Sequence, residues 1–416
     1  MTDLNLMGKL ARVASTKLNN LSDQKINDIL KYTANLIREN AEYLKSKNAI
    51  DMETAKANGK SDSFLDRLLL SDKVISGVAD GIEQVALLES PLGKTTYEYT
   101  NETQGIDIKQ VTVPFGVIGI IYEARPNVTA DAFALCFKTK NAVMLKGGSD
   151  AINSNIAMVS IIRRALKENG VDENAVQVIE DTSRQTATAF MRLNRYVDLL
   201  IPRGSANLIK TAVENSTIPI IETGSGNCHV YVDEFADIKK AVEVIFNAKT
   251  QRYSVCNACE SLVIHSAILQ KALPEIAKKL SEKQVELRLD ERALKVLPTG
   301  VPATDEDFYT EYGGPIISVK TVDSLDQAIE HINEHSTRHS ESIVTENKAN
   351  ADKFMHDIDS SSVYVNASTR FTDGFVFGFG AEIGISTQKL HARGPMGLPA
   401  LVTTKFLIKG NGAVRK

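Results

Sequence analysis

Val117-Ile118-Gly119-Ile120-Ile121-Tyr122 is a continuous apolar run in the first third of the chain. Such a run, with no polar interruption, is typical of a strand that is buried on both faces of a sheet. A helical stretch from Asp131 to Lys138 follows, and a second apolar run, Ala142 to Leu145, comes after it. Strand, helix and strand in this order predict a parallel β-sheet.

The same alternation continues along the chain. Further strands are predicted at Val176–Ile179, Val197–Ile201 and Ile218–Ile221, with helices at Ile152–Glu168, at Ser183–Met191 and after Gly204-Ser205. A second region begins at Gly224, with strands at His229–Val232, Ser261–His265 and Ile316–Val319 and helices at Asp237–Lys249, Leu269–Leu280 and Leu325–Glu334. The sequence therefore predicts an α/β fold with parallel, doubly wound sheets.

The segments outside these regions have a different pattern. Residues 5 to about 90 are predicted to be helical, as in the apolar stripe that begins at Ile26. Residues 95–100 and 106–111 alternate around a turn and predict a β-hairpin, and Leu401 to Ile408 alternates as a strand. Such a hairpin can pair with another subunit or pack on its own domain, and the pattern does not decide between the two.

Composition excludes several classes of protein. The 416 residues suffice for two or three domains, and a net charge of −4 without a long basic run gives no support to nucleic-acid binding. The first ten residues lack the apolar core of a signal peptide, and no stretch approaches the length of a membrane helix. Four cysteines in so long a chain do not make a disulfide framework, so a cytoplasmic location is expected.

One cysteine lies where a backbone turn can expose it. Cys256 stands in the stretch Gln251–Glu260, between a predicted helix and a predicted strand, and small residues follow it. A thiolate in such a place suits nucleophilic attack on a carbonyl carbon. The alternatives are a buried, inert cysteine, or a redox or metal motif formed with Cys259.

Other patterns are ambiguous when taken singly. Lys146-Gly147-Gly148-Ser149 ends a buried strand and suits an anionic ligand, and Arg203-Gly204-Ser205 opens a helix whose N–H groups can hold a phosphate. Each can also be a simple turn or helix cap. His331, His335 and His339 are spaced for a metal, but Ser336 and Thr337 are expected to end the helix and separate them. Loop arginines that could bind anions are Arg125, Arg252, Arg370 and Arg393.

Taken together and in this order, these segments resemble the aldehyde dehydrogenase superfamily and, within it, the family of γ-glutamyl phosphate reductases. The likeness covers nearly the whole chain. Its most specific parts are Tyr122–Thr129, Ile221–Tyr231, Ala328–Glu341 and Glu382–Pro395, the last two being characteristic of the reductases.

The resemblance implies an aldehyde dehydrogenase-like fold with two doubly wound α/β domains and a small β element for oligomerisation. An NADP(H)-binding domain is expected at residues 1–94 and 113–226, and a catalytic domain with the cysteine nucleophile at 227–397. The β element is expected at residues 95–112 and 398–416.

The resemblance also implies the site residues. Cys256 matches the nucleophile, Asn127 the oxyanion-hole asparagine and Glu311 the glutamate that binds the nicotinamide ribose. The remaining cofactor positions are Lys146, Gly147, Gly148 and Ser149 at the adenosine ribose and Gly204 and Ser205 at the pyrophosphate. NAD-preferring relatives usually carry a glutamate where this chain has Ser149, and a hydroxyl beside Lys146 would accept a 2′-phosphate, so NADP(H) is favoured. Glu222 matches the water-activating glutamate of hydrolytic relatives, and its role here stays open.

The implied reaction is the NADPH-dependent reduction of γ-glutamyl 5-phosphate to glutamate 5-semialdehyde, through a Cys256 thioester and with release of phosphate, in proline biosynthesis. Arg125 or Arg252 is predicted to bind a substrate carboxylate or phosphate. A homo-oligomer is expected, and whether a glutamate 5-kinase associates is left open. The alternatives are another cysteine-dependent aldehyde or acyl dehydrogenase and a non-catalytic binding protein.

Overall fold

The computed structural model describes residues 3–123 and 125–415. The chain divides into two compact units: unit 1 contains residues 1–222, 379–384 and 396–416, and unit 2 contains residues 223–378 and 385–395. The passage from unit 1 to unit 2 follows Glu222, close to the expected boundary at residue 226. Residues 379–384 fold with unit 1, whereas the expected catalytic domain included them.

The N-terminal part of unit 1 is helical, as predicted. Its helices are α1 (Leu4–Leu18), α2 (Asp23–Glu39), α3 (Ala41–Ala57), α4 (Asp62–Leu68) and α5 (Asp72–Leu87). Ser22, Ser61 and Ser71 each accept a hydrogen bond from a backbone N–H of the first turn, the usual way in which a helix start is satisfied.

A four-stranded parallel sheet lies at the centre of unit 1, in the order β5-β4-β3-β6. Its strands are β3 (Val117–Tyr122), β4 (Ala142–Gly147), β5 (Val176–Val178) and β6 (Leu199–Arg203), and the helices between and after them are α6 (Asn127–Lys138), α7 (Ile152–Glu168), α8 (Arg184–Met191) and α9 (Ala206–Asn215). The chain proceeds from β3 outward to β5 and then returns to pair β6 with the other side of β3. This reversal is a topological switch point, beside which α/β sheets bind ligands at the carboxyl ends of their strands.

One predicted strand is wrong. Residues 218–221 form a single parallel bridge between Ile220 and Leu200 instead of a strand. Pro219 has no N–H group to donate to a ladder, so the pairing stays limited to the two bonds around Leu200.

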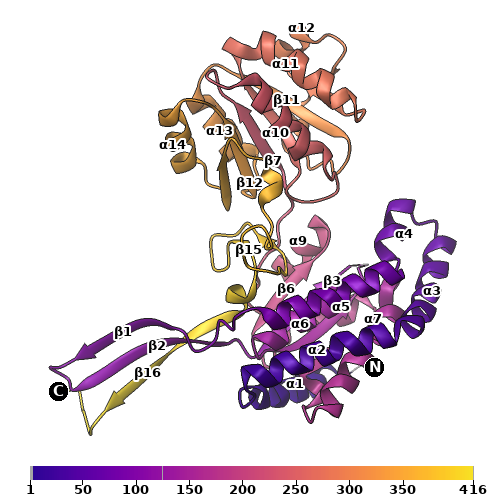
Figure 1. The fold of residues 1–416 in the computed structure, drawn as a ribbon, viewed down its shortest axis with the longest axis vertical. Helices are drawn as coiled ribbons and strands as arrows, with labels where there is room; N and C mark the ends of the chain where they lie inside the picture. Colours follow the sequence, from indigo (N-terminus) through magenta and orange to yellow (C-terminus); the bar gives the residue numbers. More distant parts are fainter. Residues whose placement is uncertain (1–2, 124, 416) are drawn as a thin grey trace. The chain divides into compact units, whose positions relative to one another are not determined.

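A three-stranded antiparallel sheet, here called the arm, consists of β1 (Thr95–Asn101), β2 (Ile106–Pro114) and β16 (Val402–Gly410). The predicted hairpin and C-terminal strand are therefore confirmed, and they pair with each other. The arm extends away from the helices of unit 1 (Figure 1). One of its faces carries the ion pair between Lys109 and Glu98, 2.8 Å apart.

Unit 2 is built on a seven-stranded parallel sheet in the order β10-β9-β11-β8-β7-β12-β13 (Figure 1). The strands are β7 (Cys228–Val232), β8 (Cys259–His265), β9 (Glu286–Leu289), β10 (Val301–Pro302), β11 (Ile316–Val322), β12 (Ser340–Val344) and β13 (Ser362–Val365). The helices are α10 (Ile238–Thr250), α11 (Ser266–Ser281), α12 (Glu291–Val296), α13 (Leu325–His335) and α14 (Lys348–Asp357). Alternate residues of β8 enter different cores: Leu262 packs in the core that includes α10 and α11, and Val263 in the core that includes α13 and α14. Both faces of the sheet are thus covered, which explains the continuous apolar runs.

The described helices include none that is long and apolar enough to cross a membrane.

Candidate active site

Cys256 lies in a tight turn between α10 and β8, as the sequence predicted. The N–H of Ala258 donates to the carbonyl oxygen of Val255 at 3.0 Å and closes the turn. The two residues after Cys256, Asn257 and Ala258, are buried, whereas Cys256 itself is partly exposed. The turn therefore leaves Cys256 partly accessible, while the two residues after it are packed into unit 2.

The four cysteines have different environments, and all four lie among the described residues. Cys136, Cys228 and Cys259 are buried, and Cys256 is the partly exposed one. Burial raises the pKa of all three buried thiols, that of Cys259 to about 12. A buried neutral thiol is a poor nucleophile, so Cys256 is the best candidate among the four for a reactive thiol. Because Cys259 lies within β8 and is fully buried, the Cys256-x-x-Cys259 pair does not form one accessible site.

The backbone of Gly226 passes directly under the Cys256 turn. A Cβ atom at position 226 would lie 1.4 Å from the carbonyl oxygen of Cys256, so only glycine fits there. The Cys228 thiol donates to the same carbonyl oxygen, with the sulfur 3.2 Å away. The segment that leads into β7 thus packs against the peptide that follows Cys256.

Asn257 ties the turn to a second segment, η4 (Thr369–Phe371). Its side-chain nitrogen donates to the carbonyl oxygen of Thr372 at 2.9 Å, and its own carbonyl oxygen accepts from the Thr369 hydroxyl at 2.7 Å. The groups in these hydrogen bonds are buried, and a buried donor or acceptor without a partner would cost free energy of folding. The bonds therefore fix Asn257, the residue that follows Cys256.

Glu311 lies on the other side of Gly226. Its Oε1 accepts the Gly226 N–H at 2.9 Å. Desolvation raises the pKa of Glu311, and the Gly226 hydrogen bond and the Lys249 charge oppose this rise. The structure thus places Glu311 and Cys256 against the same glycine.

A fully buried ion pair joins the ends of the two elements that flank the turn. Lys249 Nζ, in the last turn of α10, lies 2.5 Å from Glu260 Oε2 in β8, and both side chains are inaccessible to solvent. Burial raises the pKa of Glu260 to about 7, and Lys249 opposes this.

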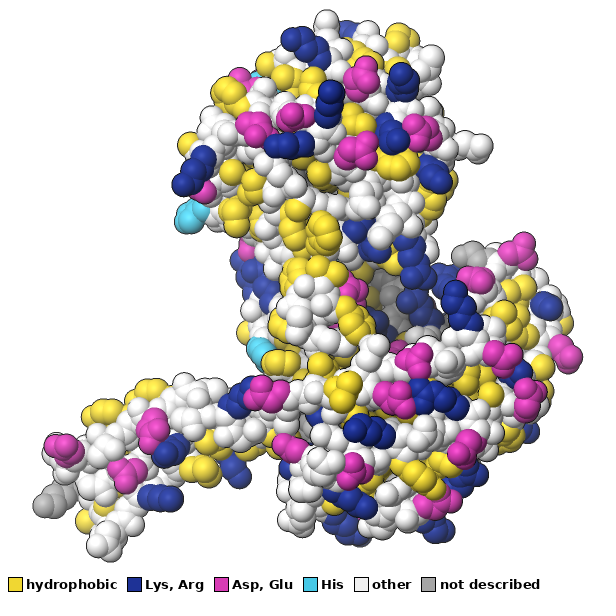
Figure 2. Space-filling view, viewed as in Figure 1, with side chains coloured by type: hydrophobic (Ala, Val, Ile, Leu, Met, Phe, Trp, Pro, Cys, Tyr) yellow, Lys and Arg dark blue, Asp and Glu magenta, His cyan; other side chains and the backbone are white. Residues whose placement is uncertain are grey.

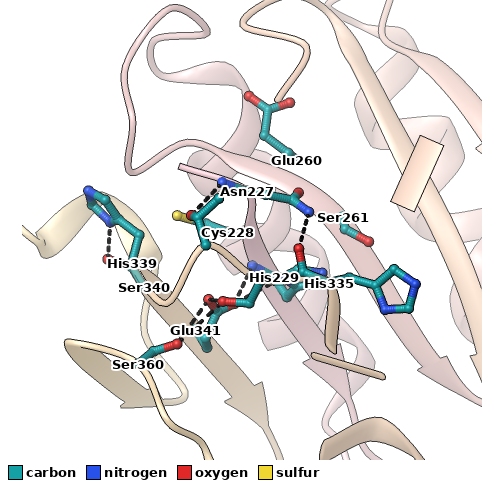
Figure 3. A network of polar contacts seen from close by, with 12 residues as sticks. Asn227, Cys228, His229, Glu260, Ser261, His335, His339, Ser340, Glu341 and Ser360 are labelled. Atoms are coloured by element: carbon teal, nitrogen blue, oxygen red, sulfur yellow. Dashed lines mark hydrogen bonds and ion pairs between the residues drawn. The ribbon is translucent and has the colours of Figure 1, made fainter. Parts of the chain in front are cut away.

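The reductase-specific stretch Ala328–Glu341 forms a buried polar network beside β7 (Figure 3). Glu341 Oε2 accepts the backbone N–H of His229 at 2.6 Å and lies 3.1 Å from its ring Nδ1. Glu341 Oε1 accepts from the hydroxyls of Ser336 at 2.5 Å and Ser360 at 3.2 Å. The network holds β7 and β12 in register immediately beyond the segment that supports Cys256.

Of the three spaced histidines, His339 separates from the other two as expected, whereas His331 and His335 stay together. α13 ends at His335, whose ring stacks on that of His331, while His339 follows the helix and bonds to Ser340. Burial lowers the pKa of His331 to about 2 and that of His339 to about 4, so both are neutral. Among the described residues no group of three or more His, Cys, Asp and Glu side chains could hold a metal ion.

The cofactor residues predicted in unit 1 gather at the carboxyl ends of its strands. Tyr122 is in register with Gly147 on one side and with Arg203 on the other, so Lys146–Ser149 and Gly204-Ser205 follow neighbouring strands at the switch point. Lys146 is buried, its Nζ donates to the Gly147 carbonyl at 3.1 Å, and burial lowers its pKa.

Glu123 contacts the start of α9, and no local sequence pattern predicts this contact. Its carboxylate accepts from the N–H of Ser205 at 3.0 Å and from the Ser205 hydroxyl at 2.7 Å. A Cβ at position 204 would come within 2.8 Å of this carboxylate, so a larger residue there would make the Glu123 side chain shift. In this structure a carboxylate takes the position at the helix N-terminus that was predicted for a pyrophosphate.

Asn127 is the first residue of α6, and its side-chain nitrogen donates to Asp131 Oδ2 at 3.2 Å. Burial raises the pKa of Asp131 to about 6. Arg125 is exposed in the turn before this helix. Asn127 and Arg125 belong to unit 1, and Arg252 and Cys256 belong to unit 2.

Comparisons with known proteins agree on the family. The aldehyde dehydrogenase family model matches residues 2–296 and 295–382. The γ-glutamyl phosphate reductases of Lachnospira eligens and Enterococcus faecalis are 54% and 52% identical to the chain, over all of it and over 100% and 99% of their own lengths.

Solved structures give the same result. The crystal structure of γ-glutamyl phosphate reductase from Thermotoga maritima superimposes with a TM-score of 0.97 at 48% identity, each chain being covered completely. An acetylating aldehyde dehydrogenase from Geobacillus thermoglucosidasius, 17% identical with a TM-score of 0.70 over all of this chain and 98% of its own, shares the fold. The chain belongs to the aldehyde dehydrogenase family and, within it, to the γ-glutamyl phosphate reductases.

Proposed function

We propose that the chain reduces γ-glutamyl 5-phosphate to glutamate 5-semialdehyde with release of phosphate, using NADPH. The observation that carries this proposal is the Cys256 turn, which presents one thiol while Gly226, Cys228 and Asn257 fix the peptide that follows it. The identity of the substrate comes from full-length relatives, 52–54% identical, that bear the name γ-glutamyl phosphate reductase.

Cys256 acts as the nucleophile in this proposal. Its thiolate attacks the carbonyl carbon of the acyl phosphate, a carbon–sulfur bond forms, and the carbon–oxygen bond to phosphate breaks. The backbone N–H of Cys256 would stabilise the oxyanion, and the family resemblance gives the Asn127 amide the same role. Bound NADPH supplies the hydride that reduces the thioester carbonyl. The carbon–sulfur bond then breaks, the semialdehyde leaves, and the Cys256 thiolate is regenerated.

The residues of unit 1 fit a phosphorylated dinucleotide. Lys146 at the end of β4 provides a cation, and exposed Ser149 provides a hydroxyl in place of a repelling carboxylate. Gly147 lets the end of the strand pack against Asn155, where a Cβ would not fit. Asp181 is the nearby acid whose charge opposes the lowering of the Lys146 pKa, and it is held by Thr186 and Ser183. Glu311 would hold the nicotinamide ribose. Gly204 and Ser205 would hold the pyrophosphate once the hydrogen bonds between Glu123 and Ser205 are broken.

We also propose that the arm mediates homo-oligomerisation. Tyr97 and Phe406 both pair with Gln110, and Tyr99 and Ile408 both pair with Ile108, so these side chains share one face of the arm. Tyr97, Tyr99, Phe406 and Ile408 are each about half exposed, at 49%, 49%, 57% and 60%. Figure 2 shows hydrophobic side chains along the surface of the arm. An apolar face on exposed strands is typical of a surface that another subunit covers.

The test is NADP⁺ reduction with glutamate 5-semialdehyde, with and without phosphate, for the native protein, Cys256→Ala and the control Cys136→Ala. Phosphate-dependent activity that disappears only in Cys256→Ala supports the proposal. Phosphate-independent activity would identify a hydrolytic dehydrogenase instead and would make Glu222 the candidate base. No activity with NADP⁺ or NAD⁺ would favour a binding protein.

A further inference from the structure

Arg370 lies beside the turn that contains Cys256, and it contacts one residue before Cys256 and one residue after it. Its Nε donates to the side-chain oxygen of Gln251 at 2.8 Å, five residues before Cys256. Its carbonyl oxygen lies 3.5 Å from the Asn257 side-chain nitrogen, and its neighbour Thr369 bonds to the Asn257 carbonyl. The guanidinium is thus held to the same short segment that carries the thiol.

The guanidinium is also electrostatically coupled to that thiol. Desolvation lowers the pKa of Arg370, the charge of Cys256 opposes this, and the neighbouring cation Arg252 adds to the lowering. Arg370 is half-buried and Arg252 is exposed. Two cations and the thiol therefore lie together on one side of unit 2.

No carboxylate among the described residues forms an ion pair with Arg370. Asp373 is the acid whose charge reaches it, but the Asp373 carboxylate accepts backbone N–H groups of its own loop, from Phe375 at 2.9 Å and Val376 at 3.2 Å. Holding a guanidinium partly desolvated beside another cation costs free energy unless an anion completes the site. A planar guanidinium suits the oxygens of a phosphate, which it can bind by two parallel hydrogen bonds.

We propose that Arg370, assisted by Arg252, binds the phosphate group that is bonded to the carbonyl carbon attacked by Cys256. The inference rests on the proposed function for the identity of the substrate. In the acyl phosphate the phosphoryl group is attached to the same carbon that receives the sulfur, so its oxygens must come close to the thiol. A cation that interacts electrostatically with Cys256 is placed for this group.

The experiment compares the native protein with Arg370→Gln, Arg370→Lys and the control Arg292→Gln. Arg292 is an arginine of the same unit, and it pairs with Asp323 at 2.7 Å. In semialdehyde oxidation, Arg370→Gln should raise KM for phosphate about 10- to 100-fold, the value of hydrogen bonds to a charged group. KM for NADP⁺ and KM for the semialdehyde should each change by less than about 3-fold. A change of that size corresponds to less free energy than one hydrogen bond to a charged group. Arg370→Lys, which keeps the charge but loses the fork, should lie in between, and Arg292→Gln should match the native protein.

A second readout does not need turnover. Inorganic phosphate should slow the alkylation of Cys256 by iodoacetamide in the native protein and in Arg292→Gln, but not in Arg370→Gln. Unchanged phosphate protection and an unchanged phosphate KM in Arg370→Gln would overturn the proposal, and a fall in kcat or thermal stability alone would show that Arg370 only supports the turn. If the native enzyme proved independent of phosphate, the proposed function would fail, while loss of phosphate protection in Arg370→Gln would still establish the anion site. If Arg370→Gln did not fold, the same two assays would compare Arg370→Lys with Gln251→Ala. Gln251→Ala removes the hydrogen bond that holds the Arg370 guanidinium.

Discussion

At the scale of single residues, the partial exposure of Cys256 in its turn predicts that this thiol is the reactive one. Three of the four thiols are buried, with raised pKa values, and one is partly exposed. We expect a disulfide reagent such as dithiobis-nitrobenzoate to react quickly with one thiol per native chain and slowly with the others. In Cys256→Ser the fast reaction should disappear. A fast thiol that persisted in this variant would show that another cysteine is accessible.

Gly226 is the residue for which the structure allows the least change. Because a Cβ there would overlap the Cys256 carbonyl oxygen, Gly226→Ala must displace the nucleophile turn. A displacement of about 1 Å can lower kcat about 10²-fold, so we expect at least that loss with little effect on the overall fold by circular dichroism. Gly77→Ala is the control, since a Cβ at this position in α5 meets open space. Activity of Gly226→Ala close to that of Gly77→Ala would contradict this geometry.

Asp131 gives the fold a pH dependence. Its pKa is raised by burial from 3.8 to about 6, so the folded state holds its proton more tightly than the unfolded state does. The stabilisation from this group is complete below about pH 4 and is lost as the pH rises through about 6. Relative to Asp131→Asn, the native protein should therefore lose up to about 3 kcal/mol of unfolding free energy between pH 4 and 7.5, measured by urea denaturation. A difference that did not change with pH would show that Asp131 titrates normally.

At the scale of elements, α10 and β8 are joined by the buried pair of Lys249 and Glu260. Removing one partner leaves an uncompensated buried charge, so Lys249→Met should lower the free energy of unfolding by about 3–5 kcal/mol. The double variant Lys249→Met/Glu260→Met should recover part of this loss, because both charges are then absent. Chemical denaturation of Lys249→Met, Glu260→Met and the double variant measures the coupling, and a loss in the double variant equal to the sum of the two single losses would mean that the pair is not coupled.

At the scale of the whole molecule, the arm should decide the oligomeric state. Phe406 and Ile408 project from its apolar face. We expect Phe406→Lys/Ile408→Lys to form a smaller species than the native protein in light scattering coupled to size exclusion. Lys405→Glu/Lys409→Glu, on the opposite face of β16, should leave the mass unchanged. Equal masses for the native protein and the Phe406→Lys/Ile408→Lys variant would exclude this face as the subunit contact.

Much of this molecule was predictable because its signals are local. The apolar run Val117–Tyr122 became the central strand of unit 1, the helical pattern before residue 90 became five helices, and the turn at Cys256 formed between a helix and a strand. Each depends on residues close together in sequence: a buried strand needs consecutive apolar side chains, and a helix needs a 3.6-residue stripe. The reductase-specific stretches also gave the family, which the comparisons confirmed.

Other features depend on contacts between distant residues and were decided by the tertiary structure alone. Residues 218–221 have a strand-like composition, but only Ile220 pairs with β6, in a single bridge. The carboxylate of Glu123 on Ser205, the Cys228 thiol on the Cys256 carbonyl and the guanidinium of Arg370 beside the nucleophile join residues that are 28 to 119 positions apart. No local pattern records such pairs, because their free energy comes from desolvation and hydrogen-bond geometry that exist only after the sheets have formed.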